Sequence, residues 1–111
     1  PKMTEKRRPH YILDDFKKLF SNEKTRIITK NARKGSASLG YMTIQHIIEI
    51  IDKLRSEHFF KSMTTYQDHK VWQDVYLYTD GEKPLYIKLQ LSFSGKEAVL
   101  IQMKRNEGSE G

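Results

Sequence analysis

Polar side chains alternate with apolar ones along residues 85–93, and they are the first feature of the sequence that could do chemistry. Successive side chains of a strand point to opposite faces, so this segment divides into an apolar and a polar face. The polar face carries Tyr86, Lys88, Gln90 and Ser92. Phenol, ammonium and amide groups offer hydrogen bonds, charge and stacking area to single-stranded RNA. On this pattern alone, the simpler interpretation is the solvated face that any antiparallel sheet presents to water.

Histidine suits general acid–base catalysis near neutral pH, because its pKa is ~6.5. His69 follows Asp68, which could hold the imidazole at a sheet edge if the pair forms a turn between two strands. A loop cap that stabilises this turn is the favoured interpretation. The four histidines show no metal-ligand spacing, and the chain has no cysteine. We therefore expect no metal site, no thiolate chemistry and no cofactor.

The length of 111 residues allows one hydrophobic core and is too short for two. We expect a single domain over residues 1–105 and a disordered polar tail over residues 106–111. No apolar run approaches the ~20 residues that span a bilayer, and no apolar stretch near the N-terminus resembles a secretory signal. These features predict a cytoplasmic protein with no membrane partner.

Helical periodicity precedes strand periodicity along the chain, which is typical of an α+β domain. Apolar residues recur at helical spacing over residues 12–21 and 40–54, and residues 34–36 are expected to form a polar loop or one weak helical turn. Strands are predicted at residues 25–29, 71–78, 85–93 and 98–104. In the last strand we expect Val99, Ile101 and Met103 on one face and Leu100, Gln102 and Lys104 on the other.

Positive charge is concentrated in the first third of the chain. The chain has 20 basic and 14 acidic side chains, of which residues 1–34 hold 11 and 4. The first third thus carries +7, and the remainder, with 9 basic and 10 acidic residues, carries −1. A polyanionic partner is plausible on this distribution, although a solvated basic terminus explains part of it equally well.

The segment FFKSMTTYQDHKVWQDVY, residues 59–76, is the most specific motif in the sequence. It closely resembles the core of the MqsR toxins, a family of messenger RNA interferases in which KSMTTY, DH and WQDVY recur in this order. The resemblance extends more loosely to the EKRRPH opening, to YIKL and to a last strand that ends in lysine. It implies a RelE-like fold, in which an antiparallel sheet packs against two or three N-terminal helices.

The resemblance also implies an endoribonuclease that cleaves messenger RNA, preferentially at GC-containing triplets, and that a cognate MqsA-type antitoxin silences. The family's proposed catalytic residues correspond to Lys61, Gln73 and Tyr86. Expected substrate contacts, some from the resemblance and some from charge, are Met63, Tyr66, Lys88, Lys104, Lys17 and Lys18. The contacts from Lys17 and Lys18 assume that the first helix lies beside the polar sheet face.

RNA brings its own nucleophile, the 2′-hydroxyl next to the scissile phosphate. The protein has to stabilise charge on the phosphorane-like transition state and to handle two protons. Lys61 and Lys104 could stabilise the charge, Gln73 could orient a phosphate or base, and Tyr86 could donate or accept a proton, without a metal ion. Two other functions fit the composition: a basic module that binds RNA or DNA without chemistry, and an interaction domain whose exposed strand edge accepts a partner.

Overall fold

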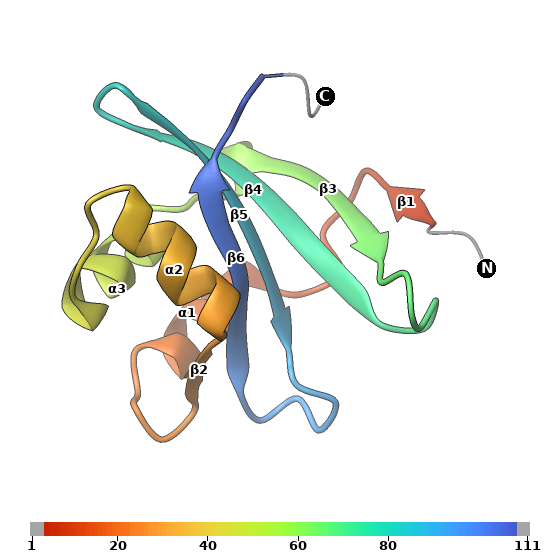
Figure 1. Cartoon of the computed structure of the whole chain (residues 1–111). Coiled ribbons are helices and arrows are strands. Elements are labelled where there is room, and N and C mark those ends of the chain that lie inside the picture. The colour runs from red at the N-terminus through yellow and green to blue at the C-terminus, as the bar shows by residue number, and fades with distance from the viewer. Residues whose placement is uncertain (1–3, 109–111) are drawn as a thin grey trace.

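The structure is a computed structural model that describes residues 4–108. Helices and strands segregate as expected for the α+β class (Figure 1). The helices are α1 (Leu13–Phe20), α2 (Lys30–Ser38), α3 (Ile44–Asp52) and the short 3-10 helix η1 (Ser56–His58). The strands are β1 (Glu5–Lys6), β2 (Arg26–Ile28), β3 (Phe59–Thr64), β4 (Trp72–Asp80), β5 (Lys83–Leu91) and β6 (Ala98–Arg105).

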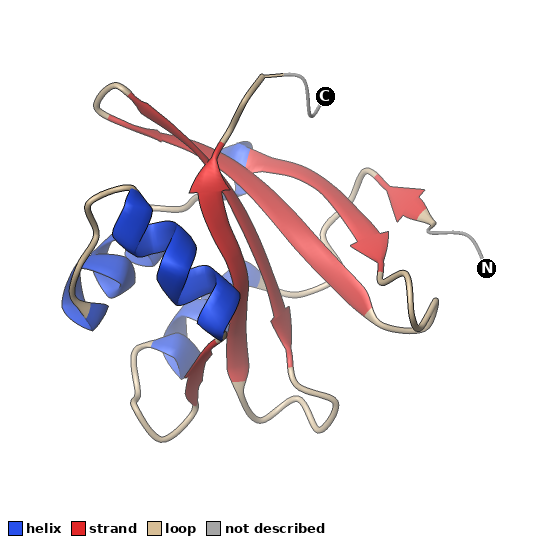
Figure 2. Ribbon diagram, viewed as in Figure 1, coloured by secondary structure: helices blue, strands red, loops and turns tan. Residues whose placement is uncertain are grey.

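The six strands form one sheet in the order β1-β3-β4-β5-β6-β2 (Figure 2). Strands β3 to β6 are antiparallel neighbours, and β1 joins β3 in the same sense. The expectation of an antiparallel sheet is wrong at one edge, because β2 runs parallel to β6. A parallel pair requires a long crossover, and in this chain α2, α3, η1 and the strands β3 to β5 lie between β2 and β6 in sequence.

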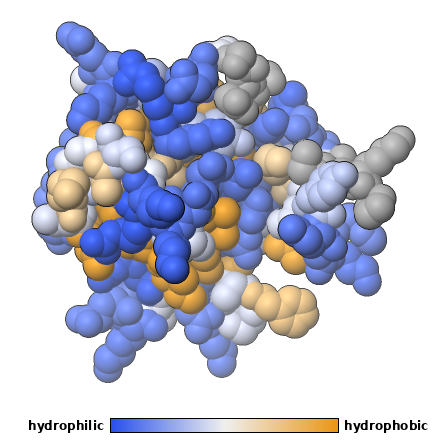
Figure 3. Space-filling model, in the orientation of Figure 1, coloured by the Kyte–Doolittle hydropathy of each residue, from blue (hydrophilic) through white to orange (hydrophobic). Residues whose placement is uncertain are grey.

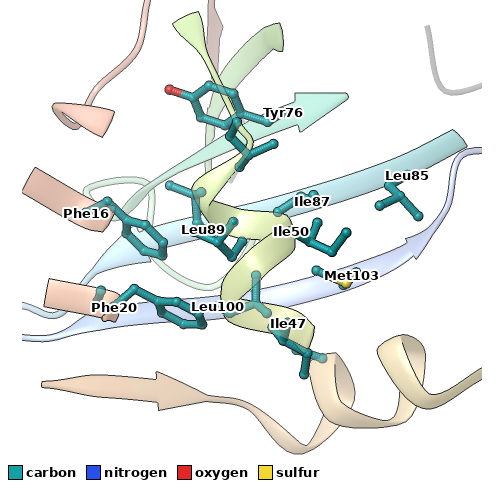
Figure 4. Close-up of a cluster of buried hydrophobic side chains, with 14 of the residues drawn as sticks. Phe16, Phe20, Ile47, Ile50, Tyr76, Leu85, Ile87, Leu89, Leu100 and Met103 are labelled. Carbon is teal, nitrogen blue, oxygen red and sulfur yellow. The ribbon is translucent and has the colours of Figure 1, made fainter. Parts of the chain in front are cut away.

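The three α-helices pack against the same face of the sheet. Their buried side chains join apolar residues of β4, β5 and β6 in one cluster (Figure 4). Phe16 and Phe20 come from α1, Ala32 from α2, and Ile47, Ile50 and Ile51 from α3. Because the helices cover only this face, the opposite face of the sheet is available for other contacts.

Helix α3 begins later than its sequence pattern predicts. The expected helix covered residues 40–54, whereas the observed one covers Ile44–Asp52. The Thr43 hydroxyl accepts a hydrogen bond from the His46 N–H at 3.1 Å and caps the helix, and Gly40 has a φ of 95° that no helix accommodates. Residues 40–43 therefore form the connection that leads from α2 into α3.

Helix α2 is longer than the loop or single turn expected around residues 34–36. It spans nine residues and is capped by the Thr29 hydroxyl, which accepts from the Ala32 N–H at 3.0 Å. A side chain at Gly35 would collide with the Met103 carbonyl oxygen on β6. Glycine at this position thus lets a largely polar helix lie close against the sheet.

A β-bulge in β6 changes which of its residues face the core. Lys88 pairs with Gln102 but Leu89 pairs with Leu100, so Ile101 is an extra residue on β6. Leu100 and Met103 are consequently both buried beneath the helices. The expected division, with Met103 on the face of Val99 and Ile101, is wrong because strict alternation stops at the bulge.

The surface of the molecule is predominantly hydrophilic in the view of Figure 3, with smaller hydrophobic areas between the charged side chains. None of the helices within residues 4–108 combines the length and hydropathy needed to cross a bilayer. In the expected tail, the Asn106 N–H donates to the Pro84 carbonyl at 2.8 Å, and residues 109–111 lie outside the described residues.

Candidate active site

The sheet face opposite the helices carries most of the side chains expected to act on a substrate. On β5, Leu85, Ile87 and Leu89 belong to the core, so the intervening side chains lie on the opposite face. We call this the open face. Strand pairing places on it Lys61, Met63, Gln73, Val75, Leu77, Tyr86, Lys88, Gln90, Gln102 and Lys104.

A second bulge brings Lys61 to the open face. Phe59 pairs with Tyr76, whereas Lys61 pairs with Val75, so Phe60 is an extra residue on β3. Without the bulge, Phe59 and Lys61, which are two positions apart, would share one face of the strand. With it, Phe59 packs against the helical core and Lys61 lies on the open face.

The Lys61 ammonium group forms an ion pair with Glu5. Its Nζ lies 2.8 Å from Glu5 Oε2, and the Lys61 side chain is only 13% exposed. The pair joins β1 to β3, whose backbones already pair at Glu5 and Met63. The hydrogen bond from Lys61 is the main cause that lowers the pKa of Glu5 below its usual value, and the nearby charges of Lys61 and Arg7 add to it. A lysine held in this way has a fixed position on the surface of the sheet.

Gln73 is held by a neighbouring amide. Its Nε2 donates to Gln90 Oε1 at 2.8 Å, and Gln90 Nε2 in turn donates to the Leu91 carbonyl at 3.2 Å. These bonds define the orientation of both amide groups. Gln73 can therefore present its carbonyl oxygen, and Gln90 its second N–H, to a ligand on the open face.

Tyr86 lies between two lysines near the middle of the sheet. The centroid of its ring is 4.8 Å from Nζ of Lys104, the residue of β6 that pairs with Tyr86, and 5.9 Å from Nζ of Lys88. Tyr86 is only 5% exposed and packs with Met63 and Val75 in a small second cluster. The expectation that this face is simply solvated is thus wrong at Tyr86, although the charged groups above it remain accessible.

The open face accordingly brings together six of the nine residues expected to form the site. They are Lys61, Gln73, Tyr86, Met63, Lys88 and Lys104, and they come from four different strands. Lysine ammonium groups can bind phosphate as point charges, amides can orient it, and a phenol can transfer a proton. The combination suits a phosphodiester, which requires charge stabilisation and proton transfer at adjacent atoms.

The other three expected residues lie elsewhere. Tyr66 is in the loop between β3 and β4 and is 69% exposed. Lys17 and Lys18 are on α1, whose Phe16 and Phe20 pack into the core on the helical side. The assumption that the first helix lies beside the open face is therefore wrong, and Lys17 instead donates to the Asp52 carbonyl of α3 at 3.0 Å.

The loop between β3 and β4 contains the histidine that was the alternative acid or base. The Asp68 carboxylate accepts from the Lys70 N–H at 2.9 Å, and Thr65 bonds both the N–H and the carbonyl of Asp68. Asp68 thus acts as a turn cap, as the favoured interpretation had it. His69 is exposed at the tip of this turn.

Sequence analysis did not assign roles to two residues that organise the site. Glu5 belongs to the EKRRPH opening, but its partner Lys61 is 56 positions away and no local pattern connects them. Asp74 is fully buried, and its carboxylate accepts hydrogen bonds from the N–H groups of His10 and Tyr11. A carboxylate at a position that alternates with the aromatic residues Trp72, Tyr76 and Tyr78 is the signal that could have identified Asp74 as an anchor.

Two comparisons with known proteins give consistent results. Residues 8–105 match the family model described as motility quorum-sensing regulator, toxin of MqsA. The mRNA interferase toxin MqsR of Escherichia coli (strain K12) is 42% identical over 72 residues, which cover 65% of this chain and 71% of that protein. The residues that match the family model include the whole open face.

Proposed function

The chain belongs to the MqsR toxin family, and from this membership we propose that it is an endoribonuclease that cleaves messenger RNA. The observation that carries the proposal is the gathering of Lys61, Gln73, Tyr86 and Lys104 on the open face, from four strands that the sequence alone does not connect. A site built on paired strands holds its groups more precisely than one built on loops.

The proposed reaction is an attack by the RNA on itself. The 2′-oxygen forms a bond to the adjacent phosphorus while the bond from phosphorus to the 5′-oxygen breaks. The 2′-hydroxyl loses a proton and the departing 5′-oxygen gains one. The products are a 2′,3′-cyclic phosphate and a 5′-hydroxyl end, and the protein does not need to supply a nucleophile.

The lysines of the open face supply the charge stabilisation. Lys61 and Lys88 stand in one row of paired residues, with Val75 between them. They are two strand spacings apart, roughly 10 Å. Lys61 donates one hydrogen to Glu5, and an ammonium group has two more that can reach phosphate oxygens. The negative charge that grows on the phosphate in the transition state is therefore met by cations that are already in place.

Tyr86 is the proposed proton donor or acceptor, and Gln73 is the proposed positioning amide. The positive charges of Lys88 and Lys104 near the Tyr86 ring favour a negatively charged phosphate at the same place. Met63 packs beside Tyr86, and Tyr66 projects from the adjacent loop, so both can contact the RNA chain. In this scheme catalysis rests on positioning and electrostatics.

Three further properties complete the proposal. Cleavage occurs preferentially at GC-containing triplets, a cognate antitoxin of the MqsA type silences the enzyme, and the fold is RelE-like. The family description, toxin of MqsA, supports the second property. Messenger RNA as substrate places the activity in the cytoplasm.

The ends of the cleaved RNA test the proposal. Purified protein should cut a synthetic single-stranded RNA in excess EDTA and leave 5′-hydroxyl and cyclic phosphate ends. The Lys61→Gln variant, purified identically, controls for contaminating ribonucleases. Products with 5′-phosphate ends, or cutting that requires a divalent ion, would contradict the mechanism. If RNA binds but is never cut, the chain is a binding module.

A further inference from the structure

The ladder between β4 and β5 ends before the strands do. Strand β4 begins at Trp72 and β5 ends at Leu91, but the last paired residues at this end are Asp74 and Leu89. Figure 1 shows the two strands diverging here, β4 alongside β3 and β5 alongside β6. We call this opening the fork. The hydrogen bond between the side chains of Gln73 and Gln90 bridges it at its narrow end.

The segment before α1 closes the fork on the helical side. The buried carboxylate of Asp74 binds the N–H groups of His10 and Tyr11, which fixes the segment across the divergent strands. Tyr11 Oη donates to the Trp72 carbonyl at 2.8 Å, a backbone group beyond the end of the ladder. Burial, with Asp74 nearby, raises the pKa of Tyr11 to about 12, so its phenol stays a neutral donor.

The fork contains a pocket of about 330 Å³. His10 and Tyr11 form its floor, and Lys70 and Val71 line it on the side of β4. On the side of β5 it is lined by the segment from Gln90 to Gly95. The volume lies at the lower end of the range for small-molecule sites, ~300–1,000 Å³, which suits one flat ring system better than a folded peptide.

The lining combines the groups that recognise a nucleobase. Gln90 offers an amide, Lys70 offers a cation for the adjoining phosphate, and the floor is aromatic. Phe93 stands at the rim with its side chain fully exposed. An exposed phenylalanine is by itself unremarkable, but at the rim of a pocket its ring can stack on a base that enters.

We propose that the fork is a subsite for one unpaired nucleobase of the RNA, next to the nucleotides that are cut. The inference rests on the proposed function, because Gln90 both lines the pocket and holds Gln73. A base in the fork fixes the register of the RNA on the open face. A base in the fork forms hydrogen bonds to Gln90 and stacks on Phe93. These contacts distinguish the subsite from nonspecific attraction of RNA to positive charge.

The test couples a change in the protein to a change in the RNA. The probe is an RNA with one mapped cleavage site, made uncleavable by 2′-deoxy substitution at the scissile nucleotide, and abasic at one flanking position in turn. Fluorescence anisotropy gives the Kd for wild type, for Phe93→Ala and for the control Met42→Ala. Met42 is 66% exposed, lies two residues before α3 and does not line the pocket. Unmodified RNA serves as the probe if wild type does not cut.

One abasic position should weaken wild-type binding about tenfold, the scale of one stacked base. Phe93→Ala should weaken binding of intact RNA to a similar extent. For this variant, the further loss of affinity caused by the abasic nucleotide at the sensitive position should be much smaller than for wild type. Met42→Ala should behave as wild type. Equal penalties in wild type and Phe93→Ala, or no sensitive position, would overturn the subsite. Such results from a protein that still cuts RNA would leave the proposed function intact, and the absence of cutting would overturn that function separately.

Discussion

Glu5 Oε2 lies 2.8 Å from Lys61 Nζ, and this contact connects the first strand of the sheet to the lysine at the centre of the proposed mechanism. The carboxylate both positions the ammonium group and offsets part of its charge. Since RNA is a polyanion, the two effects have opposite consequences for binding and for chemistry. Substitutions at Glu5 can therefore separate them.

Replacement of Glu5 by glutamine should strengthen RNA binding. The substitution removes a negative charge beside Lys61, and the slope of log affinity against log salt should steepen by up to ~0.7, the value for one added phosphate contact on a single strand. Fluorescence anisotropy across several salt concentrations measures the slope. The control is Glu23→Gln, in the exposed loop between α1 and β2. An unchanged slope would show that Glu5 does not compete with phosphate.

The same variant should reveal a pH-dependent contribution to stability. The pKa of Glu5 is lowered in the folded protein, so its contribution is present above the ordinary value of 4.5 and is lost as the pH falls through the lowered value. Wild type should thus unfold at a higher temperature than Glu5→Gln at pH 7, and the difference should vanish in more acidic solution. Thermal unfolding monitored by circular dichroism between pH 3 and pH 7 provides the measurement. A constant difference over this range would contradict the assignment.

Tyr86 allows chemistry to be separated from packing. Tyr86→Phe keeps the ring among Met63 and Val75 but removes the hydroxyl group. The single-turnover rate at saturating RNA should fall at least tenfold, about 1.4 kcal/mol of barrier, while the unfolding midpoint stays within a few degrees. Tyr86→Ala should also destabilise the fold, because it leaves a cavity in this cluster. If Tyr86→Phe cuts at the wild-type rate, Tyr86 has no role in proton transfer.

The faces of the central strands could be predicted from the sequence because β5 alternates without interruption. The bulges at Phe60 and Ile101 could not, since an extra residue is visible only when the partner strand is aligned beside it. The side of the sheet on which α1 lies could not be predicted from the sequence either, because the spacing of apolar residues shows that a helix is amphipathic but not which sheet face it covers.

Helix α2 shows a different limit. Its sequence is polar, with lysines, an arginine and a glycine within nine residues, and local preference alone does not favour a helix there. The Thr29 cap and the close approach of Gly35 to β6 stabilise it through tertiary contact. The residues expected to do the chemistry came from the motif of residues 59–76 and, for Tyr86 and Lys104, from the looser resemblance beyond it, whereas their supports, Glu5 and Gln90, required the pairing of distant strands.

The location of α1 leads to a prediction opposite to the one that charge alone suggests. Lys17→Gln with Lys18→Gln should leave RNA affinity and its salt dependence unchanged, because both residues lie on the helical side. Lys88→Gln and Lys104→Gln should each flatten the slope by up to ~0.7. The same anisotropy titrations, on the uncleavable RNA, compare the two pairs. A flattened slope for the α1 pair would mean that RNA extends around the molecule to the helices.

Asp74 supports the fork from beneath, and its substitution tests whether the floor of the pocket matters. The carboxylate accepts from His10 N–H at 3.1 and 3.0 Å and from Tyr11 N–H at 2.9 Å, with no exposure to solvent. In Asp74→Asn one oxygen becomes an NH₂ group, which cannot accept, so the His10 N–H loses one of its two acceptors and faces a donor instead, and the bonds to both N–H groups lose the negative charge that strengthens them. The free energy of unfolding should fall by roughly 1–3 kcal/mol. Urea denaturation measures this loss, and Asp52→Asn, at the exposed end of α3, is the matched control.

The same variant should loosen the segment across the fork while the sheet persists. Amide hydrogen exchange at Tyr11 should accelerate more than exchange in β5, because the Tyr11 N–H donates to the altered group and the ladder between β5 and β6 does not. The loss of affinity that an abasic nucleotide causes at the sensitive position should then be smaller than in wild type, because His10 and Tyr11 are no longer held in place beneath the base. Uniform acceleration across the whole sheet would instead show that Asp74 stabilises the fold as a whole and has no separate role in shaping the fork.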